Sequence, residues 1–136
     1  MRIALVEDNV LVARTMERQL RKLGHATERI TDVQTLLAGG TELEPDLIIT
    51  DIFMPGVEGL ELIRMLKASA LAHIPIIAIS GGGSYMGGIP DVEESFVAKA
   101  ALAFGAAKFL RKPVPLAALR DAVIECDPCP GSQGRT

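Results

Sequence analysis

Short apolar runs alternate along the chain with segments in which apolar residues recur every three or four positions. The runs predict strands, which we place at residues 2–6, 25–29, 47–50, 76–79 and 108–111. The periodic segments predict helices, which we place at residues 10–23, 32–38, 58–68, 91–104 and 115–125. Asn9 caps the first helix, Val10 begins its apolar face and Gly24 ends it. Five strand–helix units in strict alternation predict an α/β fold of three layers, in which helices cover both faces of a parallel five-stranded sheet.

Length and composition agree with one globular domain, which we place at residues 1–125. The chain has 136 residues, of which 49% are hydrophobic and only 4% aromatic, so its core must be aliphatic. Residues 126–136 are rich in Pro, Gly and Ser and predict a flexible tail or the beginning of a linker. The apolar runs are shorter than the roughly 20 residues that span a membrane, and the N-terminus lacks the apolar region of a signal peptide. We therefore expect a cytoplasmic protein.

The net charge of −3 also constrains the function. Proteins that bind nucleic acids normally present a basic face, so we expect no direct contact with nucleic acid and none with a membrane. The two cysteines, Cys126 and Cys129, have the spacing of a metal or redox pair. A zinc site needs four ligands, and the two histidines lie in other strand–helix units, so we interpret both residues as linker cysteines.

Polar residues fall where the predicted strands end. Glu7 and Asp8 follow the first strand, Asp51 the third and Ser80 the fourth, while Lys112 comes just after the fifth. In a parallel α/β sheet the carboxyl ends of the strands meet at one edge, which is where ligands bind. We therefore expect three carboxylates, one hydroxyl and one ammonium around a single site.

Three carboxylates in a small site repel each other, and a hard divalent cation such as Mg²⁺ relieves the repulsion. The carboxylate of Asp51 could then act as a nucleophile towards phosphorus and form an acyl phosphate. Mg²⁺ and Lys112 would neutralise charge on the phosphoryl oxygens, and Ser80 could donate a hydrogen bond to one of them. The residue set is thus coherent for phosphoryl capture.

These residues resemble the receiver domain of bacterial response regulators. The resemblance rests on Glu7-Asp8, on the Asp-x-x-Met-Pro-x-x-x-Gly stretch from Asp51 to Gly59, on Ser80, and on the segment 101–106 that leads into Lys112-Pro113. It covers about residues 1–125 and implies a flavodoxin-like sheet with strand order 2-1-3-4-5. It also implies that Asp51 accepts a phosphoryl group from a sensor histidine kinase or a histidine phosphotransfer protein, and that the domain then controls an unknown downstream partner.

The resemblance assigns further roles to single residues. Mg²⁺ would be bound by Glu7, Asp8, Asp51 and the backbone carbonyl of Phe53. Ser80 and Lys112 would contact the phosphoryl group, Phe109 would be the switch aromatic whose rotamer follows Ser80, and the peptide bond before Pro113 would be cis. The domain would be a signalling switch that assists its own phosphorylation and dephosphorylation, and not an enzyme.

One feature departs from the family pattern. Ser80 and Lys112 are separated by 112 − 80 = 32 positions, about ten more than is usual in the family, and the excess lies in the glycine-rich segment 81–90. The insertion puts in doubt the usual coupling between Ser80, Phe109 and the following helix. It lacks the Gly-Lys-Ser/Thr ending of a phosphate-binding loop, so we interpret it as a flexible insertion.

Three other functions compete with this interpretation. Phosphatases of the haloacid-dehalogenase type also form an aspartyl phosphate, but they need a second Asp where this chain has Phe53, which cannot transfer a proton. A flavin carrier of the same fold needs a phosphate loop after the first strand, where Glu7 and Asp8 would repel the FMN phosphate. A receiver-like module that binds partners without phosphorylation stays open, as does homodimerisation through the last helices.

Overall fold

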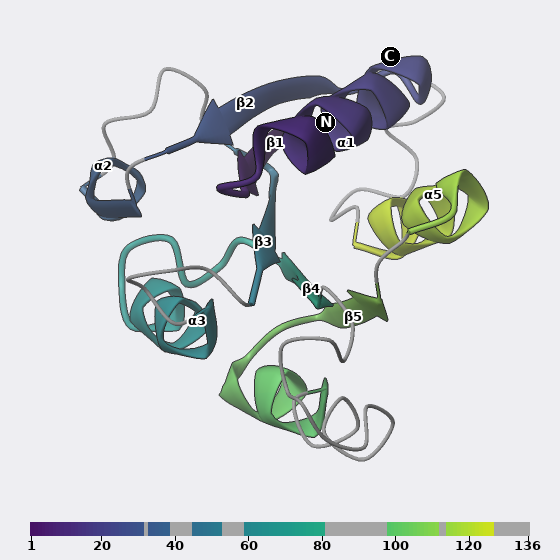
Figure 1. Ribbon diagram of the computed structural model, residues 1–136. Helices are drawn as coiled ribbons and strands as arrows, with labels where there is room; N and C mark the ends of the chain where they lie inside the picture. The colour runs from purple at the N-terminus through teal and green to yellow at the C-terminus, as the bar shows by residue number, and fades with distance from the viewer. Residues whose placement is uncertain (32, 39–44, 53–58, 81–97, 112–113, 127–136) are drawn as a thin grey trace.

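The computed structural model describes residues 1–31, 33–38, 45–52, 59–80, 98–111 and 114–126. Its strands and helices follow one another in the alternation that the sequence predicts (Figure 1). The strands are β1 (Arg2–Val6), β2 (Ala26–Ile30), β3 (Leu47–Asp51), β4 (Ile76–Ser80) and β5 (Lys108–Arg111). The labelled helices are α1 (Val10–Lys22), α2 (Val33–Leu37), α3 (Gly59–Lys67) and α5 (Leu116–Glu125), and residues 98–104 are also helical.

The five strands form one parallel sheet in the order β2-β1-β3-β4-β5. The predicted three-layer α/β fold and its strand order are therefore confirmed. β3 and β4 are buried along their whole length, because both have neighbours in the sheet and helices on both sides. The edge strands β2 and β5 are only partly buried, and β2 lies one residue later in the chain than the sequence predicts.

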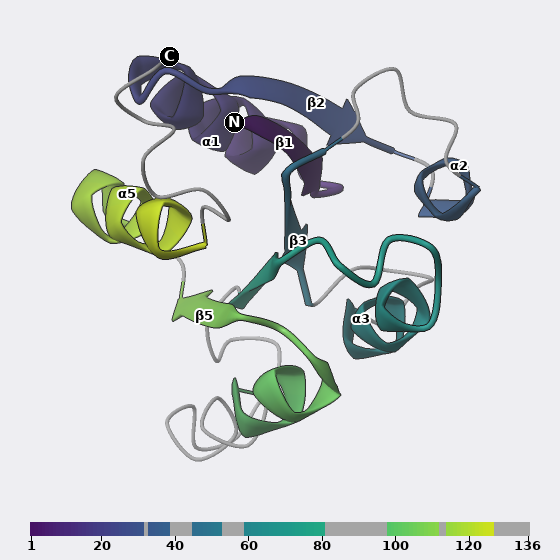
Figure 2. The same ribbon diagram turned by 180° about the vertical axis from the view of Figure 1, so that it is seen from behind.

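Two aliphatic cores lie on opposite faces of the sheet. Figures 1 and 2 show α1 and α5 on one side of the strands, and α2 and α3 on the other. Ile49 and Leu20 belong to the core beneath α1 and α5, whereas Ile48 and Leu62 belong to the core beneath α2 and α3. Successive residues of β3 thus point to different cores, as a strand with a period of two requires.

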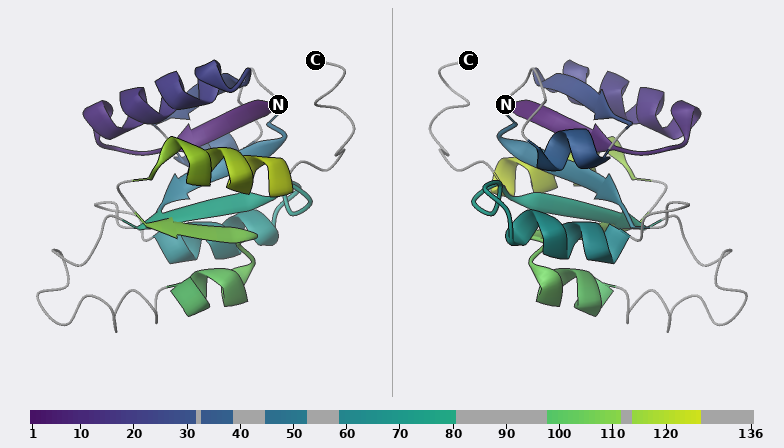
Figure 3. Two further views of the ribbon diagram at one scale, coloured as in Figure 1. Left: turned by 90° about the vertical axis from the view of Figure 1, so that its right-hand side faces the viewer. Right: turned by 90° about the vertical axis from the view of Figure 1, so that its left-hand side faces the viewer.

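α1 begins and ends where the sequence predicts. The Asn9 side chain accepts hydrogen bonds from two backbone amides of the first turn, at 3.0 and 3.1 Å, and Gly24 adopts a φ of +93° after the last turn. Val10, which we expected on the buried face, is 45% exposed. Val10 is the first residue of α1, and the start of this helix reaches beyond the end of β1 (Figure 3).

Cys126 differs from its interpretation as a linker residue. It follows α5 directly and is only 9% exposed, packed in the core beneath α1 and α5. A thiol is small and apolar enough to fill a core position, so Cys126 belongs to the packed domain and not to a linker. Residues 127–136 lie outside the described residues, so the tail stays a prediction. No helix among the described residues is long and apolar enough to cross a membrane.

Candidate functional site

The carboxyl ends of β3 and β4 bring Asp51 and Ser80 to the same edge of the sheet. Asp51 is the last residue of β3 and pairs with Ile79, the neighbour of Ser80 in β4. The ladder continues for one more bond, from the Ile52 amide to the Ile79 carbonyl at 2.8 Å. Asp51 is 5% exposed and Ser80 is fully buried, so both side chains are held by their strands at the rim of the core.

Glu7 and Asp8 follow β1 and approach Asp51. One carboxylate oxygen from each of the three residues lies within 4.8 Å of the other two. Glu7 is 3% exposed, whereas Asp8 is open to solvent. The predicted convergence of the three carboxylates is therefore confirmed, and we refer to Glu7, Asp8 and Asp51 as the acidic cluster.

The donor set of the acidic cluster fits a hard divalent cation. All three donors are carboxylate oxygens, and two of the three residues are buried where their charges are poorly screened. Mg²⁺ binds one or a few carboxylates and completes its octahedral shell with water and phosphate oxygens. Because Asp8 is exposed, water and a phosphoryl group can reach the cluster from its side. Phe53, whose carbonyl the resemblance adds to the ligand set, lies outside the described residues.

A hydrogen bond at the start of α1 orients the Glu7 side chain. The backbone amide of Asn9 donates to a carboxylate oxygen of Glu7 at 3.1 Å. Because the side chain of Asn9 also caps α1, this one residue ties the acidic cluster to the first turn of the helix.

Arg29 contributes a contact that the sequence did not predict. It is the fourth residue of β2, and its guanidinium donates from Nε to the carbonyl of Glu7 at 3.1 Å and from Nη2 to the carbonyl of Asp8 at 3.0 Å. The hydrophobic pattern identified this segment only as a weak strand. The charge of Arg29 beside two acidic residues that follow the neighbouring strand was the one available signal, and it becomes informative only when β2 is known to pair with β1.

The other predicted site residues are only partly described. Phe109 pairs with Ala78 in the sheet, is half-buried, and packs against the core beneath α2 and α3. Its proposed switching role stays a prediction. Lys112 and Pro113 lie outside the described residues, as does the glycine-rich insertion at 81–90.

The chain matches the family model described as the response regulator receiver domain over residues 3–124. It is similar to the transcriptional regulatory protein FixJ of Azorhizobium caulinodans, with 33% identity over 121 residues, which are 89% of this chain and 52% of that protein. The chain thus spans about half the length of this relative.

Two solved structures share the fold across most of the chain. A response regulator receiver protein from Pseudomonas putida has 29% identity and a TM-score of 0.73, with 91% of this chain and 95% of that chain covered. The receiver domain of a sensor histidine kinase from Pseudomonas aeruginosa has 26% identity and a TM-score of 0.72, with 92% and 95% covered, and was solved with a magnesium ion in its active-site cleft. The family match, the sheet order and the acidic cluster agree, and the chain belongs to the response regulator receiver domain family.

Proposed function

We propose that Asp51 accepts a phosphoryl group from a phosphohistidine, carried by a sensor histidine kinase or by a histidine phosphotransfer protein, with Mg²⁺ bound at the acidic cluster. The observation that carries the proposal is the meeting of three carboxylate oxygens within 4.8 Å at the end of a central strand. A bound Mg²⁺ would offset their charge and polarise the phosphoryl oxygens. We expect the exchange to take place in the cytoplasm.

Asp51, Ser80 and Lys112 would each have a separate role in the transfer of the phosphoryl group. A carboxylate oxygen of Asp51 forms a bond to phosphorus, the bond from phosphorus to the imidazole nitrogen breaks, and its electron pair stays with the departing histidine. Ser80 ends the strand beside Asp51, within the same rim, and would donate its hydroxyl to a phosphoryl oxygen. Lys112 would neutralise charge on the same group.

We further propose that the domain stores the acyl phosphate as a signal and is not an enzyme with external turnover. The position that would need a general acid for rapid hydrolysis holds Phe53, which has no exchangeable proton. The stored group would shift the population between two states of the domain, and that shift would be read by a downstream partner.

Intact-protein mass spectrometry after incubation with acetyl phosphate tests the proposal. Here the bond from phosphorus to oxygen breaks and acetate leaves, so no kinase is needed. We expect a Mg²⁺-dependent gain of one phosphoryl group in the parent and none in Asp51→Asn. Asp46→Asn is the matched control, because Asp46 precedes the opposite end of the same strand and is exposed.

Two other outcomes are informative. A folded parent that gains no phosphoryl group, with or without Mg²⁺, would refute the proposal and favour a module that binds partners without phosphorylation. A gain that persists in Asp51→Asn would show that another residue is the acceptor.

A further inference from the structure

The backbone of Glu7 and Asp8 lies beyond the part of β1 that pairs with its neighbours in the sheet. The ladders of β1 with β2 and β3 both end at Val6. The carbonyls of Glu7 and Asp8 are the next two along the chain, and each accepts a hydrogen bond from the Arg29 side chain, at 3.1 and 3.0 Å. A side chain from β2 thus continues the support of this backbone where the β1–β2 ladder stops.

The geometry of a guanidinium makes this contact directional. Nε and Nη2 belong to one rigid plane, so two hydrogen bonds from them fix the relative orientation of two successive carbonyls. Those peptide units also set the direction in which the Glu7 and Asp8 side chains leave the backbone. Hydrogen bonds from a charged donor are stronger than neutral ones, which favours a well-defined loop.

We propose that Arg29 is a positioning residue for Mg²⁺: by holding the carbonyls of Glu7 and Asp8, it keeps their carboxylates in the arrangement that the cation requires. The inference rests on the proposed function, because it takes Mg²⁺ to bind at the acidic cluster. Arg29 does not touch the cation in this scheme and acts only through the backbone that carries two of its ligands.

The charge of Arg29 and its hydrogen bonds should affect Mg²⁺ affinity in opposite directions. A positive charge next to a cation site repels the cation, so loss of this charge should tighten Mg²⁺ binding if charge is what matters. Loss of the two hydrogen bonds should weaken binding if position is what matters. Partners that orient metal ligands typically contribute about 10- to 100-fold to metal affinity, so we expect position to outweigh charge.

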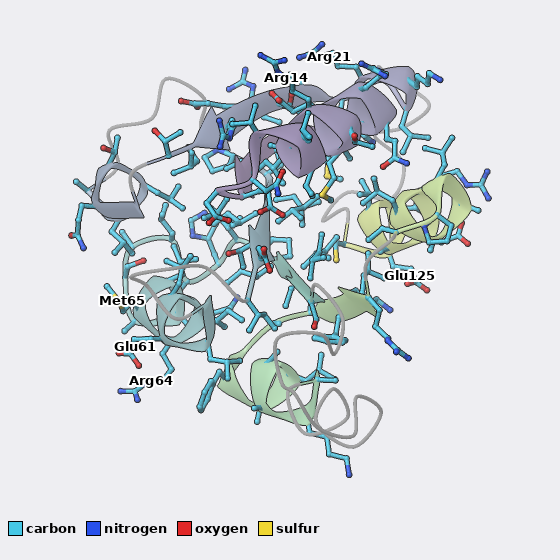
Figure 4. The ribbon with its side chains drawn as sticks, viewed as in Figure 1. Arg14, Arg21, Glu61, Arg64, Met65 and Glu125 are labelled. Atoms are coloured by element: carbon cyan, nitrogen blue, oxygen red, sulfur yellow. The ribbon has the colours of Figure 1, made fainter. Side chains whose placement is uncertain are left out.

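Isothermal titration of the metal-free protein with MgCl₂ at constant ionic strength separates the two effects. We expect the Kd of Arg29→Gln to rise by about tenfold over the parent, the low end of that range. Arg29→Lys keeps the charge but loses the two-donor plane, so its Kd should also rise above that of the parent, whereas a purely electrostatic role of Arg29 would leave it unchanged. Arg21→Gln is the matched control, because Arg21 points to solvent from the outer side of α1, where its side chain is 67% exposed (Figure 4).

A second measurement distinguishes positioning from a general loss of stability. Amide hydrogen exchange of the metal-free protein should show faster exchange at residues 7–12 in Arg29→Gln and unchanged exchange in β3 and β4. Equal or tighter Mg²⁺ binding by Arg29→Gln, with the parent still binding Mg²⁺, would overturn the inference and leave the proposed function intact. Absence of Mg²⁺ binding by the parent and Arg21→Gln would overturn both.

Discussion

Asp51→Asn removes one of three negative charges from the acidic cluster while it keeps the shape of the side chain. With oxygens within 4.8 Å of one another, two unit charges repel by about 0.9 kcal/mol in water and about 3.5 kcal/mol at an effective dielectric constant of about 20. Asp51 and Glu7 are buried, which favours the upper value for their pair, whereas Asp8 is exposed and screened. We therefore expect the variant to be more stable than the parent without Mg²⁺, by about 1–3 kcal/mol.

Thermal unfolding measures the difference in Tm between Asp51→Asn and the parent, first in chelator and then in Mg²⁺. For a domain of this size, 1 kcal/mol corresponds to a change in Tm of about 3–5 °C, so Asp51→Asn should unfold several degrees above the parent in chelator. Mg²⁺ at about 100 times its Kd should then raise the stability of the parent by about 2.7 kcal/mol, which nearly closes a gap of about 3 kcal/mol and reverses a gap of about 1 kcal/mol. The variant, which has lost a ligand, should respond much less.

Asp46→Asn is the control variant for this prediction. Asp46→Asn also removes a negative charge, but Asp46 accepts a hydrogen bond from the Arg2 amide at 2.9 Å and lies outside the acidic cluster, so it should not gain stability. If Asp51→Asn unfolds at or below the Tm of the parent in chelator, repulsion does not dominate at Asp51, and its charge contributes more through favourable contacts than it costs.

Three further predictions concern positions outside the acidic cluster. Asn9→Ala should cost about 1 kcal/mol by removing the cap of α1, measured from the urea midpoint. Gly105→Ala should cost about 2 kcal/mol or more and exceed Gly24→Ala, because both glycines have positive φ but only at Gly105 would the new Cβ lie 2.7 Å from Lys67 Cγ; equal losses would contradict this. Burial raises the pKa of Cys126, so its alkylation should need a higher pH in the folded than in the urea-unfolded protein, and equal alkylation rates would refute this. The stability owed to the neutral thiol should fall as pH rises above about 8.5.

The strands and the three carboxylates were predictable because they depend on local patterns. A continuous apolar run such as Leu47–Thr50 predicts a strand that is covered on both faces of the sheet. The rule that parallel strands end at one edge of the sheet then brings Glu7, Asp8 and Asp51 together. The family resemblance supplied the strand order, which periodicity does not contain. These predictions needed no knowledge of side-chain directions.

The contacts of Arg29, Val10 and Cys126 could not be predicted in the same way. Arg29 reaches the cluster because it pairs with Leu5 in the neighbouring strand, and this register is a property of the folded sheet. Val10 has the spacing of a buried residue but is the first residue of α1, and the start of that helix passes the end of β1. Cys126 follows the last helix and still packs in the core, because the end of a helix in sequence is not the end of its buried face.

The site therefore combines two kinds of support that respond to different mutations. Asp51 and Ser80 end strands that have a core on each face, so their positions depend on the stability of the whole domain. Glu7 and Asp8 lie beyond the ladders of β1 and are held by hydrogen bonds from Arg29 and from the backbone at the start of α1. Loss of these hydrogen bonds should change Mg²⁺ affinity with little effect on the core. Loss of core volume, by contrast, should lower the free energy of unfolding while the affinity of the molecules that remain folded stays close to that of the parent.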